Sequence, residues 1–220
     1  MNYGLNKVLQ NLTRIDSLLD ELQHGLKSCH LQPPLQDRPY PACEVDQLPL
    51  SDDEQRHAAG LMRVNNAGEV AAQGLYRGQS LTARDPQIKA AMNAAANEEN
   101  EHLNWCQQRL SELKLGRSKL DGIWYWGSFT IGALAGAVGD KWSLGFVKET
   151  EEQVYRHLEE HISRLPGADE RSRTILETMK NDEIQHAINA GKAGAAPLPR
   201  MVRSAMTAVS KIMTFTAYRV

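Results

Sequence analysis

The sequence has few cysteines and almost no net charge, and both features exclude classes of protein. The three cysteines, Cys29, Cys43 and Cys106, are too few and too scattered for a disulfide framework or a thiolate metal site. Among the 220 residues, 25 basic side chains nearly balance 27 acidic ones, so the formal net charge is −2. A nucleic-acid-binding domain normally carries a strongly basic surface. We therefore expect one domain with appendages and no nucleic-acid partner.

The chain also lacks an apolar run long enough to span a bilayer. The uncharged stretch from Ile123 to Val138 has 16 residues, whereas a spanning helix needs about 20. Aromatic residues at its start and glycines at spacings of five, four and three leave two interpretations open, an interfacial or re-entrant membrane segment or a buried helix with close backbone packing. No basic-then-apolar signal peptide opens the sequence, so we expect a location in the cytosol.

Helix-breaking residues are missing from the middle of the chain, between Pro86 and Leu113. That segment has no glycine and no second proline, and its many alanines predict a helix. Two positions of its apolar stripe hold Glu99 and His102, which are three residues apart and so share one helix face. An ionised carboxylate buried without a partner costs several kcal/mol, so a cation is expected there. The apolar members of the stripe are Ile88, Met92, Ala95 and Cys106.

The same replacement of apolar stripe residues occurs in three further helical segments. Glu69 lies in the stripe of residues 53–81, Glu151 in that of 144–165, and a second Glu-x-x-His motif in that of 175–192. One Glu from each of two helices and a Glu-x-x-His from each of two others is the ligand set of ferritin-like di-iron or di-manganese bundles. The sequence therefore predicts an all-α, ferritin-like four-helix bundle. The predicted metal ligands are Glu69, Glu99, His102, Glu151, Glu183 and His186.

Prolines and capping residues divide the chain into four parts. We expect an N-terminal amphipathic helix at 1–27, a proline-rich connector at 28–50, the bundle at 51–194 with the apolar segment 122–147, and an apolar and basic helix at 195–220 that packs on the bundle or a membrane. Capping residues predict where the four ligand helices begin. These residues are Ser51 with Glu54, Asp85, Asp140 and Asp169.

Four motifs within the predicted bundle, residues 51–194, resemble those of the demethoxyubiquinone hydroxylases of ubiquinone (coenzyme Q) biosynthesis. They are RVNNAGE at 63–69, EENEHL at 98–103, GDKWS at 139–143 with Glu151 downstream, and DEIQHA at 182–187. The resemblance covers about residues 50–220. It implies a membrane-associated, carboxylate-bridged di-iron monooxygenase that hydroxylates a polyprenylated benzoquinol, demethoxyubiquinol, with O2. The family's iron ligands fall on the same six residues that the stripes had identified.

The resemblance also implies cofactors, partners and a location. The ligand residues alone would accept iron or manganese, and the resemblance implies iron, with two Fe ions per chain. It also implies O2 as co-substrate, and it leaves the electron donor open among the quinol, NADH and a reductase. The expected partners are the polyprenyl quinol, a membrane surface and other ubiquinone-biosynthesis proteins, at the cytoplasmic face of the cell membrane. No catalytic residue is predicted beyond the metal ligands. Asp182 is predicted to accept the free ring N–H of His102 and so to set its tautomer.

The chain departs from the family pattern at two places. Asn66 stands where bacterial members are expected to have His, and His157 is followed by Leu158 where some members have Tyr. The role of His157 stays open. Two other classes of function stay open as well, another ferritin-like di-metal protein (a ferroxidase or a manganese catalase) and a non-enzymatic lipid- or quinone-binding helical protein. For a polyprenyl tail, we expect residues 122–138 and the Met-rich C-terminal segment to provide the apolar route.

Overall fold

A computed structural model describes residues 14–30 and 38–220, which form helices and, within those residues, no strand. The all-α prediction is confirmed. The predicted helix before residue 14, and Pro33 and Pro34 of the connector, lie outside the described residues. The helices are α2 (Arg14–His30), α3 (Asp52–Thr82), α4 (Pro86–Glu112), α5 (Asp121–Val138), α6 (Asp140–Arg164), α7 (Glu170–Lys192) and α8 (Arg200–Ala217).

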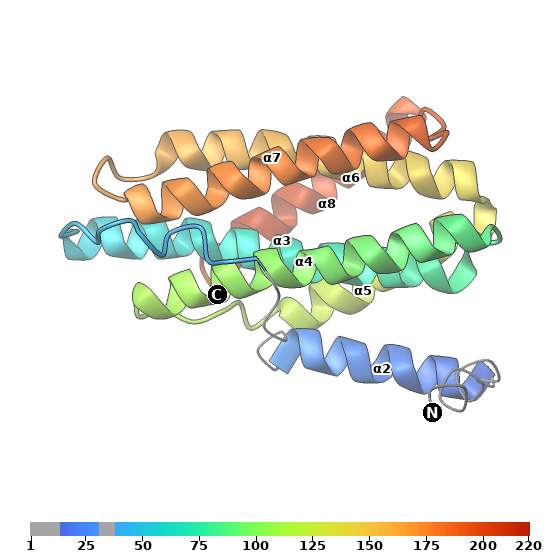
Figure 1. The fold of residues 1–220 in the computed structure, drawn as a ribbon, viewed down its shortest axis with the longest axis horizontal. Coiled ribbons are helices and arrows are strands. Elements are labelled where there is room, and N and C mark those ends of the chain that lie inside the picture. Colours follow the sequence, from blue (N-terminus) through green and yellow to red (C-terminus); the bar gives the residue numbers. More distant parts are fainter. Residues whose placement is uncertain (1–13, 31–37) are drawn as a thin grey trace, which may run out of the picture.

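The four ligand-bearing helices form the bundle, and the ferritin-like prediction is confirmed (Figure 1). Helix α3 packs along α4 and α6 packs along α7, and the two pairs face each other with α4 opposite α7 and α3 opposite α6. Helices α5 and α8 lie against α3 and α6, whereas α2 lies against α5 and α3. The apolar core at one end of the bundle includes Met62, Leu110, Leu158, Ile175 and Met179.

Three of the four predicted N-caps are present, and one is wrong. Ser51 forms a capping box with Glu54, and the carboxylates of Asp85 and Asp169 accept from backbone N–H groups in the first turns of α4 and α7. Asp140, however, is the first residue of α6 and makes no capping bond to it. Its carboxylate instead accepts the backbone N–H groups of Arg84 (3.1 Å) and Asp85, so it holds the turn between α3 and α4.

Helix α5 packs closely on α3, as one of the two interpretations of its sequence predicted, and the other, a segment at a membrane interface, stays a prediction. Glycines on both helices allow close backbone packing, because a Cβ at Gly132 of α5 would clash with the carbonyl oxygen of Leu75, and a Cβ at Gly78 of α3 would clash with that of Phe129. The opposite face of α5 leaves large apolar side chains in contact with solvent, including Ile123 and Leu134. Among the described helices, none is both long and apolar enough to cross a membrane.

A buried arginine joins α4, α7 and the connector. The guanidinium of Arg109, which is fully buried, donates to Asp169 (2.7 Å), Ser172 (2.8 Å), Gln47 (2.6 Å) and Glu112 (2.8 Å). The same oxygen of Asp169 accepts the backbone N–H of Ser172 and so caps α7. These charge-assisted bonds satisfy a cation that would be costly to bury alone.

A second buried polar pair, between α6 and α3, makes the stability of the fold depend on pH. His161 donates its Nδ1 hydrogen to the side-chain oxygen of Asn65 at 2.8 Å, and burial, reinforced by the nearby His157 and Arg164, lowers the pKa of His161 to about 3. In the unfolded chain the imidazole pKa is about 6.5. As pH falls below 6.5 the unfolded state therefore binds a proton that the folded state does not, and stability is lost down to about pH 3.

We expect this histidine to lower the free energy of unfolding by about 2 kcal/mol between pH 6.5 and pH 5. Urea unfolding of the wild type and of the variant His161→Gln at both pH values measures the effect. Glutamine does not titrate, so the variant should lose about 2 kcal/mol less over this interval. Parallel pH profiles for the two proteins would contradict the assignment.

Candidate metal centre

All six predicted ligand residues converge between the two helix pairs. Their side-chain ligand atoms form two groups, within each of which the atoms lie no more than 4.8 Å apart. Glu99 of α4 and Glu183 of α7 belong to both groups, so the two groups overlap. The first group is Glu69, Glu99, His102 and Glu183, and the second is Glu99, Glu151, Glu183 and His186.

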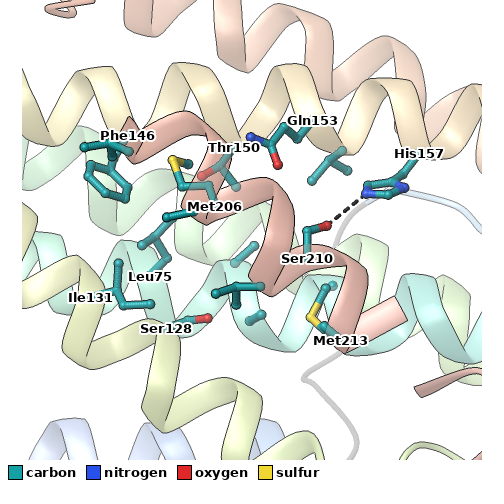
Figure 2. A pocket seen from close by; sticks show the side chains of 17 residues that line it. Leu75, Ser128, Ile131, Phe146, Thr150, Gln153, His157, Met206, Ser210 and Met213 are labelled. Carbon is teal, nitrogen blue, oxygen red and sulfur yellow. Dashed lines mark hydrogen bonds between the residues drawn. The ribbon is translucent and has the colours of Figure 1, made fainter. Parts of the chain in front are cut away.

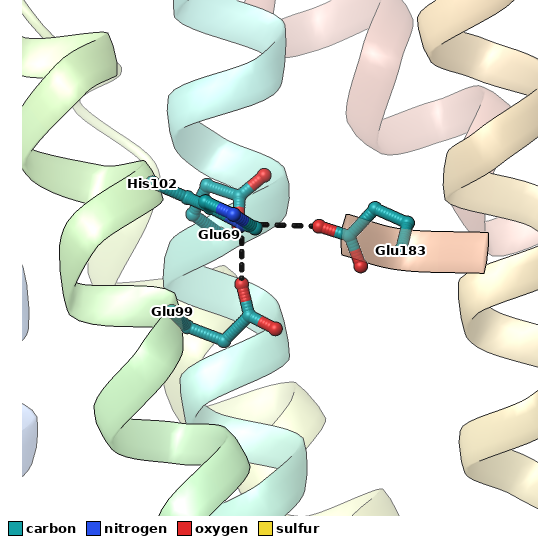
Figure 3. Close-up of side chains that lie close together, drawn as sticks. All are labelled: Glu69, Glu99, His102 and Glu183. Atoms are coloured by element: carbon teal, nitrogen blue, oxygen red, sulfur yellow. Dashed lines mark hydrogen bonds and ion pairs between the residues drawn. The ribbon is translucent and has the colours of Figure 1, made fainter. Parts of the chain in front are cut away.

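The first group surrounds one ring nitrogen of His102 with carboxylates (Figure 3). Nδ1 lies 3.1 Å from an oxygen of Glu99, 3.1 Å from one of Glu183 and 3.6 Å from one of Glu69. A single ring nitrogen has at most one hydrogen to donate, so it cannot satisfy three carboxylates. A divalent cation bound by Nδ1 and these oxygens would satisfy all of them, and nitrogen and oxygen ligands of this kind suit iron or manganese.

In the second group, too, one imidazole nitrogen faces more carboxylate oxygens than it can satisfy. His186 Nδ1 lies 3.5 Å from an oxygen of Glu99 and 3.5 Å from one of Glu183. Among the described residues, neither His186 Nδ1 nor Oε1 of Glu99 has a hydrogen-bond partner. Glu151 accepts a hydrogen bond from the hydroxyl of Tyr76. The buried, unpartnered atoms of this group therefore fit a second cation, and Glu99 and Glu183 are placed to bridge the two.

Burial controls the protonation of the cluster. Desolvation raises the pKa of Glu69 and of Glu151, and the charges of the neighbouring glutamates raise both further. For His186, burial lowers the pKa, but the carboxylates around it outweigh this effect and raise its pKa to about 9. For Glu183, burial raises the pKa, but hydrogen bonds from neighbouring side chains outweigh this effect and lower it. The raised pKa values of Glu69, Glu151 and His186 favour bound protons in the absence of metal. Metal binding must displace them, because carboxylate and imidazole ligands bind in their deprotonated forms.

The residues that support the candidate ligands come from two helices, α3 and α7, and from the connector. Asp182 lies 3.0 Å from Nε2 of His102, as the sequence had predicted for an acceptor of that ring N–H. Sequence reasoning missed two contributors. Tyr76 stands in the α3 stripe but gave no sign of its bond to Glu151, and Arg38, which donates to Asp182 at 2.8 Å, lies in the connector with no pattern around it.

The two departures from the family pattern lie away from the ligands. Asn66 is buried and donates its side-chain N–H to Asp121 at 3.3 Å, so it joins α3 to the start of α5. His157 is half-buried on α6, and its Nε2 lies 2.9 Å from the hydroxyl oxygen of Ser210 on α8. Neither residue belongs to the two ligand groups.

An apolar cavity of about 340 Å³ lies beside helices α3 and α6, which carry Glu69 and Glu151 (Figure 2). Its walls come from α3, α5, α6 and α8, and they include Leu75, Ile131, Phe146 and Met206. Gly68 and Ala72, which precede and follow the ligand Glu69 on α3, form part of the wall, as do Thr150 and Val154 on either side of Glu151. His157 and Ser210 supply polar atoms in the wall.

Comparison with known proteins identifies the family. The family model described as "Ubiquinone biosynthesis protein COQ7" matches residues 56–217. A protein of Nitrosococcus oceani named 3-demethoxyubiquinol 3-hydroxylase is 51% identical over 209 residues, which cover 95% of this chain and 98% of that protein. Proteins of the same name from Xanthomonas euvesicatoria pv. vesicatoria (51% identity, 93% of this chain, 94% of that one) and Dechloromonas aromatica (48%, 93% and 98%) are also similar. The chain belongs to the COQ7 family of ubiquinone biosynthesis proteins.

Proposed function

We propose that this protein is a di-iron monooxygenase that hydroxylates the ring of a polyprenylated demethoxyubiquinol with O2 in ubiquinone biosynthesis. Support comes from the relatives' shared name and, in the structure, from two overlapping ligand groups and an apolar cavity whose wall includes sequence neighbours of Glu69 and Glu151 on α3 and α6. A ferroxidase or a manganese catalase needs the ligand groups but not a cavity large enough for a quinol ring. The cavity is therefore the observation that carries the proposal.

The ligand residues create a dry site for two metal ions. Two ferrous ions bound there would supply electrons and open coordination positions for the activation of O2. Glu69, Glu99 and Glu183 are at most 4% exposed, so water is excluded and the field of each charge is strong. The bond from Tyr76 to Glu151 and that between Asp182 and His102 hold one carboxylate and one imidazole in a single orientation.

The apolar cavity would hold the quinol beside these ligands. Its apolar wall suits the ring's methyl and methoxy groups and the start of the polyprenyl tail, whereas His157 and Ser210 offer hydrogen bonds to ring oxygens. Ile131 of α5 and Val209 of α8 line the cavity and are also exposed, at 40% and 48%. The tail would therefore leave through an opening between α5 and α8.

The experiment that tests the function is a single turnover with labelled oxygen. Anaerobically reduced, iron-loaded protein would be mixed with a short-chain demethoxyubiquinol and isotopically labelled O2, and the product examined by mass spectrometry. One labelled oxygen atom on the ring is expected, while the second atom of O2 leaves as water. Rapid oxidation of the ferrous ions without ring oxygenation would replace the proposal with a ferroxidase.

Filling the cavity should weaken quinol binding without affecting the metal. Ala205 on α8 lines the cavity, and the variant Ala205→Trp places an indole where the ring or tail would lie. We expect KM for the quinol to rise about tenfold, because overpacking that costs about 1–3 kcal/mol corresponds to a ratio between roughly 5 and 160. The matched control is Ala208→Trp, on the same exposed helix but outside the cavity wall. Equal KM values for the two variants would place the quinol elsewhere.

We also propose that the opening between α5 and α8 rests on a membrane surface at the cytoplasmic face of the cell membrane. Exposed apolar side chains extend from this opening along both helices, and α8 adds basic side chains that suit anionic lipid headgroups. The apolar residues are Ile123, Leu134 and Val138 of α5, and Met201, Ile212 and Phe215 of α8. The basic residues are Arg203 and Lys211 of α8 and Arg219, two residues after its end.

Replacing Leu134, which is 64% exposed, by glutamate should reduce partition into anionic lipid vesicles about tenfold. Withdrawing one leucine from an apolar environment costs about 1.5–3 kcal/mol, and the new charge adds to that cost. Vesicle co-sedimentation measures the partition. The control is Ile188→Glu on α7, which is 41% exposed and lies on a helix that packs against α6 and α4 rather than α5. If both variants bound vesicles like the wild type, α5 would not face the lipid.

A further inference from the structure

The candidate metal centre has a second side, which differs from the quinol side in its chemistry. Opposite the apolar cavity, between α4 and α7, lies a polar cavity of about 200 Å³. It reaches the outer edges of both ligand histidines, His102 and His186. Its other wall residues are Arg38, Glu98, Asp182, Gln185 and Asn189.

We propose that this polar cavity, here called the α4/α7 port, is the route by which divalent cations reach the metal centre, and that Arg38 is a removable cationic plug within it. The proposal rests on the metal centre assigned under the proposed function. It adds a role for Arg38 and Glu98, neither of which belongs to the ligand groups.

The exposure of the ligands places the port at the solvent side of the centre. The side chain of His186 is 14% exposed, whereas those of His102, Glu99 and Glu183 are at most 2% exposed. Glu98, whose side chain is 59% exposed, lies 2.9 Å from Nε2 of His186, and Nδ1 of the same ring faces Glu99 and Glu183 inside the bundle. A cation that meets Glu98 in solvent is therefore one imidazole away from the buried carboxylates.

Arg38 occupies the port and neutralises part of its charge. Its guanidinium lies 2.8 Å from Asp182, 3.2 Å from Glu101 and 4.8 Å from the ring centre of Trp105. The connector thereby joins α4 and α7 across the opening. The side chain of Arg38 is nevertheless 44% exposed, and exposed ion pairs contribute little to stability. A cation attracted by the same carboxylates can therefore displace Arg38.

The apolar cavity offers a hydrated cation no comparable route. Its wall is mostly aliphatic, aromatic and methionine side chains, without a carboxylate among its lining residues. A divalent ion would have to lose its hydration water there without replacement ligands, and such desolvation is very costly. In the α4/α7 port, carboxylates, amides and imidazole can replace the water one ligand at a time.

The test is the rate at which the apo full-length chain takes up a divalent cation. Co(II), followed by its visible absorption in a stopped-flow instrument, is the probe, and ferrous ion under anaerobic conditions is the second probe. Glu98→Gln keeps a hydrogen-bond acceptor for His186 but removes the charge, and we expect it to slow uptake about threefold to tenfold. Arg38→Gln removes the plug and should accelerate uptake by a similar factor. With metal in large excess, both variants should reach the final metal content of the wild type, because neither residue belongs to the ligand groups.

Matched controls separate the port from the overall charge of the protein. Glu170→Gln removes a charge on α7 at twelve residues, or about 18 Å, from Asp182, well beyond the Debye length of about 8 Å at physiological salt. Arg56→Gln removes an exposed arginine at the start of α3. Both controls should load at the wild-type rate.

The outcomes distinguish the port from the proposed reaction. Wild-type uptake rates for both Glu98→Gln and Arg38→Gln would overturn the port, as would equal changes in the two controls. Failure of the wild type to take up metal would overturn the port together with the metal centre. Altered uptake in a protein that does not hydroxylate a quinol would leave the port in place and reject only the reaction.

Discussion

Replacement of Glu183 by glutamine is expected to prevent assembly of the metal centre and to reduce ring hydroxylation at least 100-fold. Loss of a residue that merely supports a ligand already costs 10–100-fold in metal affinity or activity. Glu183 belongs to both ligand groups, and its two oxygens face different histidines, Oε1 toward His102 and Oε2 toward His186. The variant therefore removes one negative ligand from both metal positions at once.

Metal analysis and thermal unfolding measure this loss independently of activity. A site at a metal concentration 100 times its Kd stabilises the folded state by about 2.7 kcal/mol, so the wild type should melt higher when loaded with metal. Glu183→Gln should show no such increase. Glu177→Gln, an exposed glutamate on the same helix, is the matched control and should keep the metal content, the stabilisation and the turnover of the wild type. A full metal complement in Glu183→Gln would reject the assignment of this residue as a bridge.

The largest effect on stability is expected for Arg109→Met. Breaking a buried ion pair by removing one partner costs about 3–5 kcal/mol, because the other charge stays buried without compensation. Asp169 is as fully buried as Arg109, and it would lose its cationic partner while it still has to cap α7. Gln47 and Ser172 would lose their bonds in the same variant, so the connector and the start of α7 should both loosen.

Urea unfolding of the metal-free protein measures the change in the free energy of unfolding. The control is Arg164→Met, which removes an arginine of α6 that is 47% exposed and paired with Glu160 one turn away. Such exposed pairs are worth about 0–1 kcal/mol, so the control should unfold close to the wild type. A loss below about 1 kcal/mol in Arg109→Met would show that water compensates Asp169 after all.

The four bundle helices and the convergence of the six candidate ligand residues could be predicted because their signal is local. Glu99 and His102 are three residues apart on one helix, and the helical period alone shows that they share a face with Met92 and Cys106. The structure places these apolar neighbours in the core, so the carboxylate and the imidazole are buried with them. The caps Asp85 and Asp169 were predictable for the same reason, since a capping side chain acts within one turn.

Other parts of the site could not be predicted, because they depend on which segments meet in space. Asp140 carries the sequence signal of an N-cap, but the turn between α3 and α4 comes close enough to take its carboxylate instead. Arg38 precedes the ligand helices by many residues, and nothing in its surroundings indicates that it lies beside Asp182. The hydroxyl of Tyr76 meets Glu151 only because α3 and α6 face each other.

The amino-acid sequence by itself determined the helical class and the four helices over which the candidate ligand residues are divided, because side-chain periodicity and capping depend on a few neighbouring residues. The tertiary structure decided which atoms meet. It paired α3 with α4 and α6 with α7, covered one side of the ligands with α5 and α8 to form an apolar cavity, and left the other side to a polar port that Arg38 occupies. These contacts join residues far apart in the chain, and they exist only once packing and burial bring the helices together.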